Sequence, residues 1–174
     1  MNTQLLTTPP LSLYIHIPWC VEKCPYCDFN SHALKSTIPE QDYVNALIVD
    51  LDADIARFDL SGRPLHSIFI GGGTPSLFSA EAIESLLSQV LSRFKYNASS
   101  IEITLEANPG TVEADKFIGF AKAGITRLSI GVQSFESEKL VKLGRIHNVE
   151  QAKFAAQLAH ECGVKSFNLD LMHG

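Results

Sequence analysis

The sequence predicts an α/β protein whose core is a partial (β/α) barrel of about five parallel strands with helices on the outside. Five short runs rich in β-branched and apolar residues recur along the 174-residue chain. Between them lie longer segments whose apolar residues recur at spacings of three and four, as in amphipathic helices. Strands that alternate with helices are joined by crossovers, which make neighbouring strands parallel. The predicted strands are residues 11–17, 67–70, 100–106, 126–132 and 166–172.

Four helices are predicted between these strands, two from apolar stripes and two from the residues at their ends. The stripes are Tyr43, Leu47, Leu51, Ile55 and Phe58, and then Ile83, Leu86, Leu87, Val90, Leu91 and Phe94. Thr111 is expected to cap the third helix, which ends at Gly124. Asn148 and Gln151 resemble a capping box for the fourth helix, which ends at Gly163.

Several predicted strands alternate between apolar and polar residues, although strands buried on both faces are usually continuous apolar runs. Because side chains alternate across a strand, the apolar phase can pack on helices while the polar phase lines a wet or ligand-filled space. The polar phase consists of Glu102, Thr104, Glu106, Arg127, Ser129, Gln133, Asn168 and Asp170. An antiparallel sheet with one solvated face is the alternative, but long helical connections fit crossovers better than hairpins.

The predicted barrel is incomplete, because five strands do not close an ordinary (β/α) barrel and the sequence ends directly after the fifth, at Gly174. We therefore expect either a fragment of a longer protein or an open sheet edge covered by another chain, since exposed edges invite pairing. Residues 1–10 are expected to form an N-terminal extension, and residues 11–174 a single incomplete domain.

The amino-acid composition of the chain argues against several classes of function. The chain is 45% apolar and 19% charged with a net charge of −5, which is typical of one soluble globular domain. A dedicated nucleic-acid-binding role is not expected, since such domains carry a basic excess. No stretch approaches the ~20 apolar residues of a transmembrane helix, and the N-terminus lacks the pattern of a signal peptide. We therefore expect a cytoplasmic protein, in which clustered cysteines serve as metal ligands or redox groups and not as disulfides.

Three of the four cysteines, Cys20, Cys24 and Cys27, form a CxxxCxxC pattern. Three thiolates from one loop can converge on a cubic iron–sulfur cluster, and they leave one of its irons open. Tetrahedral zinc is the alternative, with His16 or His32 as a fourth ligand. A thiol redox pair would need only the last two cysteines and would leave the first unexplained.

Residues at the carboxyl ends of the strands are expected to line the binding site, because parallel α/β sheets bind ligands there. The second strand runs into GGGTP at residues 71–75, where glycines let the backbone approach a ligand closely. A simple tight turn would also explain them. Other strand ends and the loop after the fourth strand supply carboxylate, amide and guanidinium groups, which together suit a zwitterionic nucleoside. These residues are Glu106, Gln133, Arg145 and Asp170.

Together these motifs resemble the radical S-adenosylmethionine superfamily. The cysteine pattern, with an aromatic residue before its last cysteine, and GGGTP after the second strand carry the resemblance. The segments YIHIPWCVEKCPYCDFNSH, IFIGGGTPS, EANPG, RLSIGVQSF, LGRIH and NLDLMHG are similar to the oxygen-independent coproporphyrinogen III oxidase group and its haem-chaperone branch. The resemblance begins at about Leu11, so residues 11–174 would be an incomplete radical SAM core domain.

This resemblance implies a [4Fe–4S] cluster bound by Cys20, Cys24 and Cys27, whose fourth iron binds S-adenosylmethionine. An electron delivered to such a cluster would cleave S-adenosylmethionine to methionine and a 5′-deoxyadenosyl radical. The resemblance also implies contacts with S-adenosylmethionine at several matching positions. These are Tyr14, Gly72, Gly73, Thr74, Glu106, Gln133, Arg145 and Asp170.

Phe29 distinguishes two functions that the resemblance implies. The oxidases carry a further cysteine two residues after the third of the motif, where this sequence has Phe29. The difference favours a haem chaperone, which binds haem as cargo and delivers it to respiratory haem proteins, over an enzyme that decarboxylates coproporphyrinogen. The family further suggests an electron donor for the cluster and a homodimer. A zinc-stabilised α/β binding module is the third hypothesis.

Overall fold

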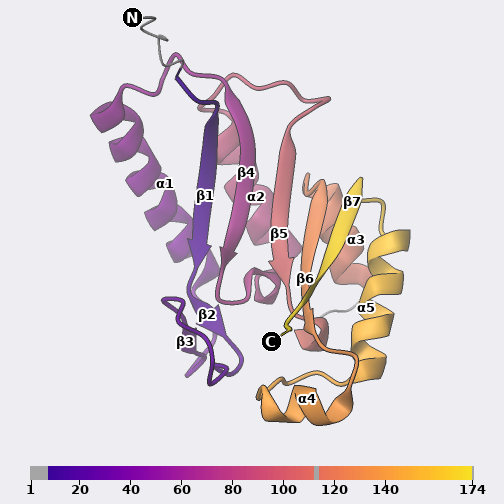
Figure 1. The fold of residues 1–174 in the computed structure, drawn as a ribbon. Helices are drawn as coiled ribbons and strands as arrows, with labels where there is room; N and C mark the ends of the chain where they lie inside the picture. The colour runs from indigo at the N-terminus through magenta and orange to yellow at the C-terminus, as the bar shows by residue number, and fades with distance from the viewer. Residues whose placement is uncertain (1–7, 112–113, 174) are drawn as a thin grey trace, which may run out of the picture.

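A single parallel sheet forms the centre of the computed structural model, which describes residues 8–111 and 114–173 (Figure 1). The sheet has five strands in the order β1-β4-β5-β6-β7, and every neighbouring pair is parallel. The strands are β1 (Leu11–Ile17), β4 (Leu65–Gly72), β5 (Glu102–Ala107), β6 (Arg127–Gln133) and β7 (Ser166–Leu171). The predicted α/β class with five parallel strands is therefore confirmed. Most of the expected N-terminal extension, residues 1–7, lies outside the described residues, as does Gly174.

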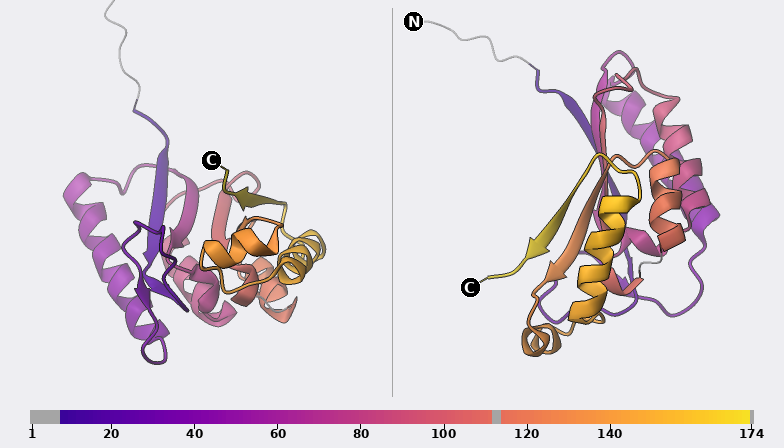
Figure 2. Two further views of the ribbon diagram at one scale, coloured as in Figure 1. Left: turned by 60° about the horizontal axis from the view of Figure 1, so that its bottom comes forward. Right: turned by 90° about the vertical axis from the view of Figure 1, so that its right-hand side faces the viewer.

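The long helices form one layer behind the sheet. They are α1 (Glu40–Phe58), α2 (Ala80–Leu91), α3 (Ala114–Lys122) and α5 (Val149–Glu161). Contacts run from α1 to α2, from α2 to α3 and from α3 to α5, so the layer is continuous. The edge-on view shows this layer on one side, while no helix of the described residues covers the other face of the sheet (Figure 2).

Three further elements, which the sequence did not predict, lie near the carboxyl ends of the strands. The helix α4 (Ser137–Lys142) follows β6, and the strands β2 (Trp19–Cys20) and β3 (His32–Ala33) pair in parallel within the segment after β1. Two short 3-10 turns, at Pro75–Leu77 and Pro109–Thr111, follow β4 and β5. None of the helices in the described ranges is long and apolar enough to cross a membrane.

The ends of the predicted helices follow from local hydrogen bonds. The capping box at α5 is present: the Asn148 side chain accepts from the Gln151 backbone, and the Gln151 side chain accepts from the Asn148 backbone. Gly163, with φ of 95°, follows the helix as expected. Thr111 instead belongs to a 3-10 turn, where its hydroxyl donates to the Asn108 carbonyl. Residues 112–113, directly before α3, lie outside the described residues.

The apolar phase of the strands packs against the helix layer, as the alternation predicted. On β5 and β6 its members are at most 2% exposed; they are Ile103, Leu105, Leu128, Ile130 and Val132. The helical stripes join the same core except for Phe58, and Leu171 of the strands' apolar phase is likewise outside it. Phe58 is 58% exposed, because it is the last residue of α1 and the chain turns away at Asp59. Leu171 is 55% exposed because β7 is an edge strand.

Replacing Asn148 with alanine tests the capping box. Asn148→Ala removes a side-chain acceptor from an otherwise unpaired backbone N–H at the start of α5, which should lower the free energy of unfolding by about 1 kcal/mol. Urea unfolding followed by circular dichroism measures the change. Gln157→Ala, on the exposed face of the same helix, is the matched control and should stay within about 0.5 kcal/mol of the wild type. Equal effects of the two substitutions would contradict the capping role.

Candidate functional site

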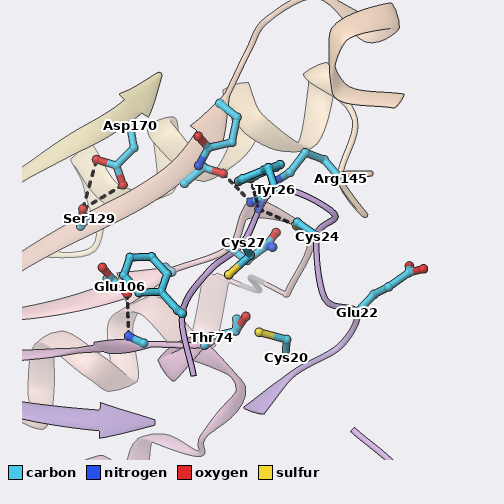
Figure 3. A pocket seen from close by; sticks show the side chains of 17 residues that line it. Cys20, Glu22, Cys24, Tyr26, Cys27, Thr74, Glu106, Ser129, Arg145 and Asp170 are labelled. Atoms are coloured by element: carbon cyan, nitrogen blue, oxygen red, sulfur yellow. Dashed lines mark hydrogen bonds between the residues drawn. The ribbon is translucent and has the colours of Figure 1, made fainter. Parts of the chain in front are cut away.

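A pocket at the carboxyl ends of the strands brings together nearly all of the residues predicted from the sequence (Figure 3). The predicted residues that line it are Cys20, Cys24, Cys27, Gly72, Gly73, Thr74, Glu106, Gln133, Arg145 and Asp170. The close-up shows the cysteines on one side of the pocket, with Glu106 and Asp170 on the other. The strand ends supply the acidic side and the loop after β1 supplies the sulfur side.

The cysteine loop is closed at its base by backbone hydrogen bonds. The N–H of His32 donates to the carbonyl of Pro18, and the N–H of Leu34 donates to the carbonyl of Cys20, at 2.7 and 2.8 Å. Within the loop, the N–H of Cys27 donates to the carbonyl of Cys24 at 3.0 Å, which forms a tight turn. The loop therefore presents three cysteines, all free thiols, to the same pocket.

His16 anchors the cysteine loop to β1. Its Nε2 lies 2.8 Å from the carbonyl oxygen of Asn30, and its Nδ1 lies 2.9 Å from the hydroxyl of Tyr14. Because a carbonyl only accepts, Nε2 carries the proton and Nδ1 accepts from the tyrosine. With both nitrogens engaged, His16 is not available as the fourth ligand of the alternative zinc site. Within the described ranges, no three His, Cys, Asp or Glu side chains are grouped to hold a single metal ion.

The glycine turn after β4 packs directly against the cysteine loop. The N–H groups of Gly73 and Thr74 donate to the carbonyls of Ile17 and Trp19, both at 2.7 Å. A Cβ on Gly73 would lie 2.5 Å from the Trp19 carbonyl oxygen, so no side chain fits there. The glycines therefore allow the two loops to pack closely. From the sequence alone, this role could not be distinguished from a close approach of the backbone to a ligand.

Glu106 is a partly buried carboxylate aimed into the pocket from the end of β5. Its Oε2 accepts a hydrogen bond of 3.0 Å from the backbone N–H of Gly72. Burial raises the pKa of this carboxyl above its usual value, and the nearby charge of Asp170 adds to the rise, while the Gly72 N–H and His16 oppose it. Two carboxylates on one pocket wall make that wall suitable for a cationic ligand.

Arg145 connects the cysteine loop to β6. Its Nη2 donates to the Gly131 carbonyl at 2.7 Å, and its Nη1 lies 3.4 Å from the sulfur of Cys24 and 3.3 Å from the hydroxyl of Tyr26. Its Nε is buried without a hydrogen-bond partner, and it forms no ion pair with a carboxylate of the described residues. Arg145 lines the pocket and has no carboxylate partner among the described residues, so its guanidinium fits a ligand carboxylate.

A β-bulge places Gln133 at the end of β6. The register with β7 shifts between Gly131 and Gln133, and Gln133 adopts a left-handed backbone conformation with φ of 67°. A Cβ on Gly131 would lie 3.1 Å from Nε2 of Gln133 and 3.4 Å from Nη2 of Arg145. Gly131 therefore keeps room for both side chains. The sequence analysis missed this residue, although a glycine inside a strand is a recognised signal.

Tyr14 is the one predicted cofactor residue that does not line this pocket. It is 55% exposed, its hydroxyl bonds to His16, and its ring stacks on Phe69 with centroids 6.2 Å apart. Its contact with a cofactor stays a prediction. Conversely, the pocket has lining residues that the sequence analysis did not assign to a ligand: Glu22, Tyr26, Phe29, Ala107, Asn108, Ser129 and Gly131. Ser129 was recognised only as part of the polar phase.

The donor set of the pocket fits an iron–sulfur cluster with an adjacent zwitterion. Three free thiols on one loop suit a cubic cluster, which takes them at separate iron corners. The guanidinium of Arg145, which has no carboxylate partner among the described residues, and the carboxylates of Glu106 and Asp170 lie within the same pocket. This arrangement can hold a ligand that carries both charges next to the thiols.

Comparisons with known proteins show which sequences this chain is similar to. The family model described as the radical SAM superfamily matches residues 14–174. The haem chaperone HemW of Haemophilus influenzae is 65% identical over 168 residues, which are 95% of this chain and 44% of HemW. HemW of Escherichia coli is 61% identical over 170 residues, 98% of this chain and 44% of its own. The chain thus spans less than half the length of these relatives.

Solved structures show the same fold. The coproporphyrinogen III oxidase HemN of Escherichia coli, a radical SAM enzyme, superposes with a TM-score of 0.83 at 32% identity, over 95% of this chain and 37% of HemN. The cobalamin-dependent S-adenosylmethionine radical enzyme OxsB superposes with a TM-score of 0.59 at 17% identity, over 95% of this chain and 25% of its own, which shows the fold alone. From the family match over residues 14–174, the chain belongs to the radical SAM superfamily.

Proposed function

We propose that the chain is the cluster- and cofactor-binding part of a haem chaperone, which binds haem and delivers it to respiratory haem proteins. One observation carries the cofactor-binding part of the proposal: three free thiols, two carboxylates and an arginine with no counter-ion among the described residues line a single pocket. The haem-chaperone part is supported by the names of the relatives. Cys20, Cys24 and Cys27 would bind a [4Fe–4S] cluster. S-adenosylmethionine, a zwitterion with a sulfonium and a nucleoside, is the second ligand.

The pocket residues have separate roles in this proposal. Arg145 binds the carboxylate of S-adenosylmethionine and also donates to the sulfur of Cys24, which stabilises negative charge there. Glu106 supports the cationic end of the ligand, and Asp170 accepts from the ribose hydroxyls. Gln133 offers an amide donor and acceptor beside them. When bound and reduced by an electron donor, the cluster supplies the electron that cleaves the carbon–sulfur bond of S-adenosylmethionine.

Phe29 supports the chaperone over the oxidase. It lines the pocket and is 64% exposed, at the position where the oxidases carry a further cysteine. Two relatives named haem chaperone are 65% and 61% identical to this chain, whereas the oxidase structure is 32% identical. Cytoplasmic placement is part of the proposal, because free thiols beside a cluster require a reducing compartment. A homodimer is the oligomeric state that we propose with it.

Anaerobic reconstitution with iron and sulfide tests the cluster. We expect the reduced wild type to give a [4Fe–4S]⁺ EPR signal that changes when S-adenosylmethionine is added, because one iron is left open to the ligand. Cys24→Ala should lose most of the bound iron. Cys162→Ala is the matched control, since Cys162 is buried at the end of α5 outside the pocket, and it should retain the cluster. Stoichiometric zinc in place of iron would contradict the proposal.

Titration with haem, beside a turnover assay, tests the chaperone role. The reconstituted protein should bind haem stoichiometrically, seen as a shifted Soret band, and should not consume coproporphyrinogen faster than the Cys24→Ala variant does. Phe29 supplies no thiol at the position of the oxidases' additional cysteine, which is the reason to expect no turnover. Turnover that depends on S-adenosylmethionine and on Cys24 would instead favour the oxidase.

The raised pKa of Glu106 predicts a pH dependence of cofactor binding. A carboxylate attracts a cation only when ionised, so affinity for S-adenosylmethionine should fall as pH is lowered through a pKa that lies above the usual 4.5. Glu106→Gln should weaken binding at neutral pH and remove this pH dependence, since glutamine keeps an acceptor for the Gly72 N–H but carries no charge. Equilibrium dialysis with labelled S-adenosylmethionine measures both effects. An unchanged pH profile in the variant would assign the dependence to another group.

A further inference from the structure

A chain of hydrogen bonds crosses the polar face of the sheet from Arg127 to Asp170. Nη2 of Arg127 donates to Oδ1 of Asn168, and Nη1 lies 3.3 Å from the hydroxyl of Thr104. Nδ2 of Asn168 then donates to Oδ1 of Asp170 at 2.5 Å. From the other side, the hydroxyl of Ser129 donates to Oδ2 of Asp170 at 3.0 Å. The carboxylate is therefore held by one donor from its own strand, β7, and one from the neighbouring strand, β6 (Figure 3 shows the Ser129 contact).

Arg127 fixes the orientation of the Asn168 amide. A guanidinium has only donors, so the amide oxygen of Asn168 must face Arg127 and the amide nitrogen must face Asp170. Without Arg127, the amide could turn its oxygen toward the carboxylate, which would replace a hydrogen bond by repulsion. Arg127 thus acts on Asp170 only through Asn168.

The strand register leaves the pocket side of Asp170 open. Asp170 lies opposite Gly131 in the pairing of β6 and β7, so the neighbouring strand places no side chain beside the carboxylate on that side. Asp170 also lines the pocket, whereas Arg127 and Asn168 do not. Each carboxylate oxygen has about two acceptor positions. Asn168 donates to Oδ1, and the Ser129 hydroxyl lies 3.0 Å from Oδ2 and 3.3 Å from Oδ1. Because a hydroxyl has a single proton, Ser129 fills one position at a time, and two positions remain for donors from a ligand.

We propose that Arg127 and Asn168 are positioning residues, which orient the Asp170 carboxylate to accept hydrogen bonds from the two adjacent hydroxyls of a bound ribose. The inference rests on the proposed binding of S-adenosylmethionine. It assigns a role to two side chains outside the pocket, and it makes recognition of the ribose a property of strands β5, β6 and β7 together. The hydroxyl of Thr104, which is fully buried, accepts a hydrogen bond from Nη1 of Arg127.

The test compares S-adenosylmethionine with its 2′-deoxy analogue. Arg127→Met and Asn168→Leu should weaken the binding of S-adenosylmethionine about tenfold, since a hydroxyl loses its well-oriented acceptor. Binding of the analogue, which lacks one of the two hydroxyls, should weaken much less. Arg127→Lys keeps a cationic donor and should partly restore the preference for the ribose. Binding is followed by the EPR change of the reconstituted protein, with iron content measured for each variant.

Arg93→Met is the matched control, because Arg93 pairs with Asp52 on the helix side of the protein and should leave both affinities unchanged. Equal weakening of both ligands by Arg127→Met and Asn168→Leu would show a merely structural role and overturn the inference. Wild-type affinities in these variants would overturn it too, while the proposed function stands. If the wild type binds neither ligand, the proposed function fails and the inference fails with it. Asn168→Leu on the edge strand keeps the test decisive if Arg127→Met does not fold.

Discussion

The site depends on a parallel sheet that, in the part of the chain that the structure describes, helices cover on one face only. Because side chains alternate along each strand, one register places the apolar residues of β5 and β6 under the helices and the polar residues on the open face. A shift of one residue would exchange the two faces and would bury Glu106 against the helices. The hydrophobic core therefore selects the register, and the register in turn places Glu106 beside Ser129 and Gly131 beside Asp170.

The pocket holds several groups in states that cost folding free energy. The carboxyl of Glu106 has a raised pKa because burial disfavours its charge, and Nε of Arg145 is buried without a hydrogen-bond partner among the described residues. Gln133 adopts a left-handed backbone conformation, which costs a non-glycine residue on the order of 1 kcal/mol. A ligand that carries opposite charges at its two ends would satisfy both ionic groups, so part of its binding free energy offsets these costs.

The elements predicted correctly are those set by local patterns. Strand positions follow from alternating runs, and the start of α5 follows from the side chains of Asn148 and Gln151. The helix α4 was missed because it is short, and its end depends on the turn at Gly144, where a Cβ would lie 2.8 Å from Pro25 of the cysteine loop. Such a contact joins segments far apart in the sequence, so no local pattern reveals it.

The site residues also fall into two groups: those that a local pattern predicts, and those whose role depends on contacts between distant segments. The cysteines, the glycine turn and the polar strand ends could be predicted, because their residue types alone indicate chemistry. The sequence could not predict which of these side chains form hydrogen bonds with each other. That Arg127 contacts Asn168 depends on the pairing of β6 with β7, and on the amide orientation that a guanidinium imposes. Sequence alternation identifies the face on which a residue lies, but not its partner on the next strand.

The pocket is formed by strand ends on one side and by the cysteine loop on the other. The carboxylates stand on strands whose backbone is paired on at least one side, whereas the thiols stand on a loop held by β2–β3 pairing and by His16. Arg145 contacts both, through the sulfur of Cys24 and the carbonyl of Gly131. A ligand carboxylate at this guanidinium would therefore act on the hydrogen bond to the sulfur as well, through a single side chain.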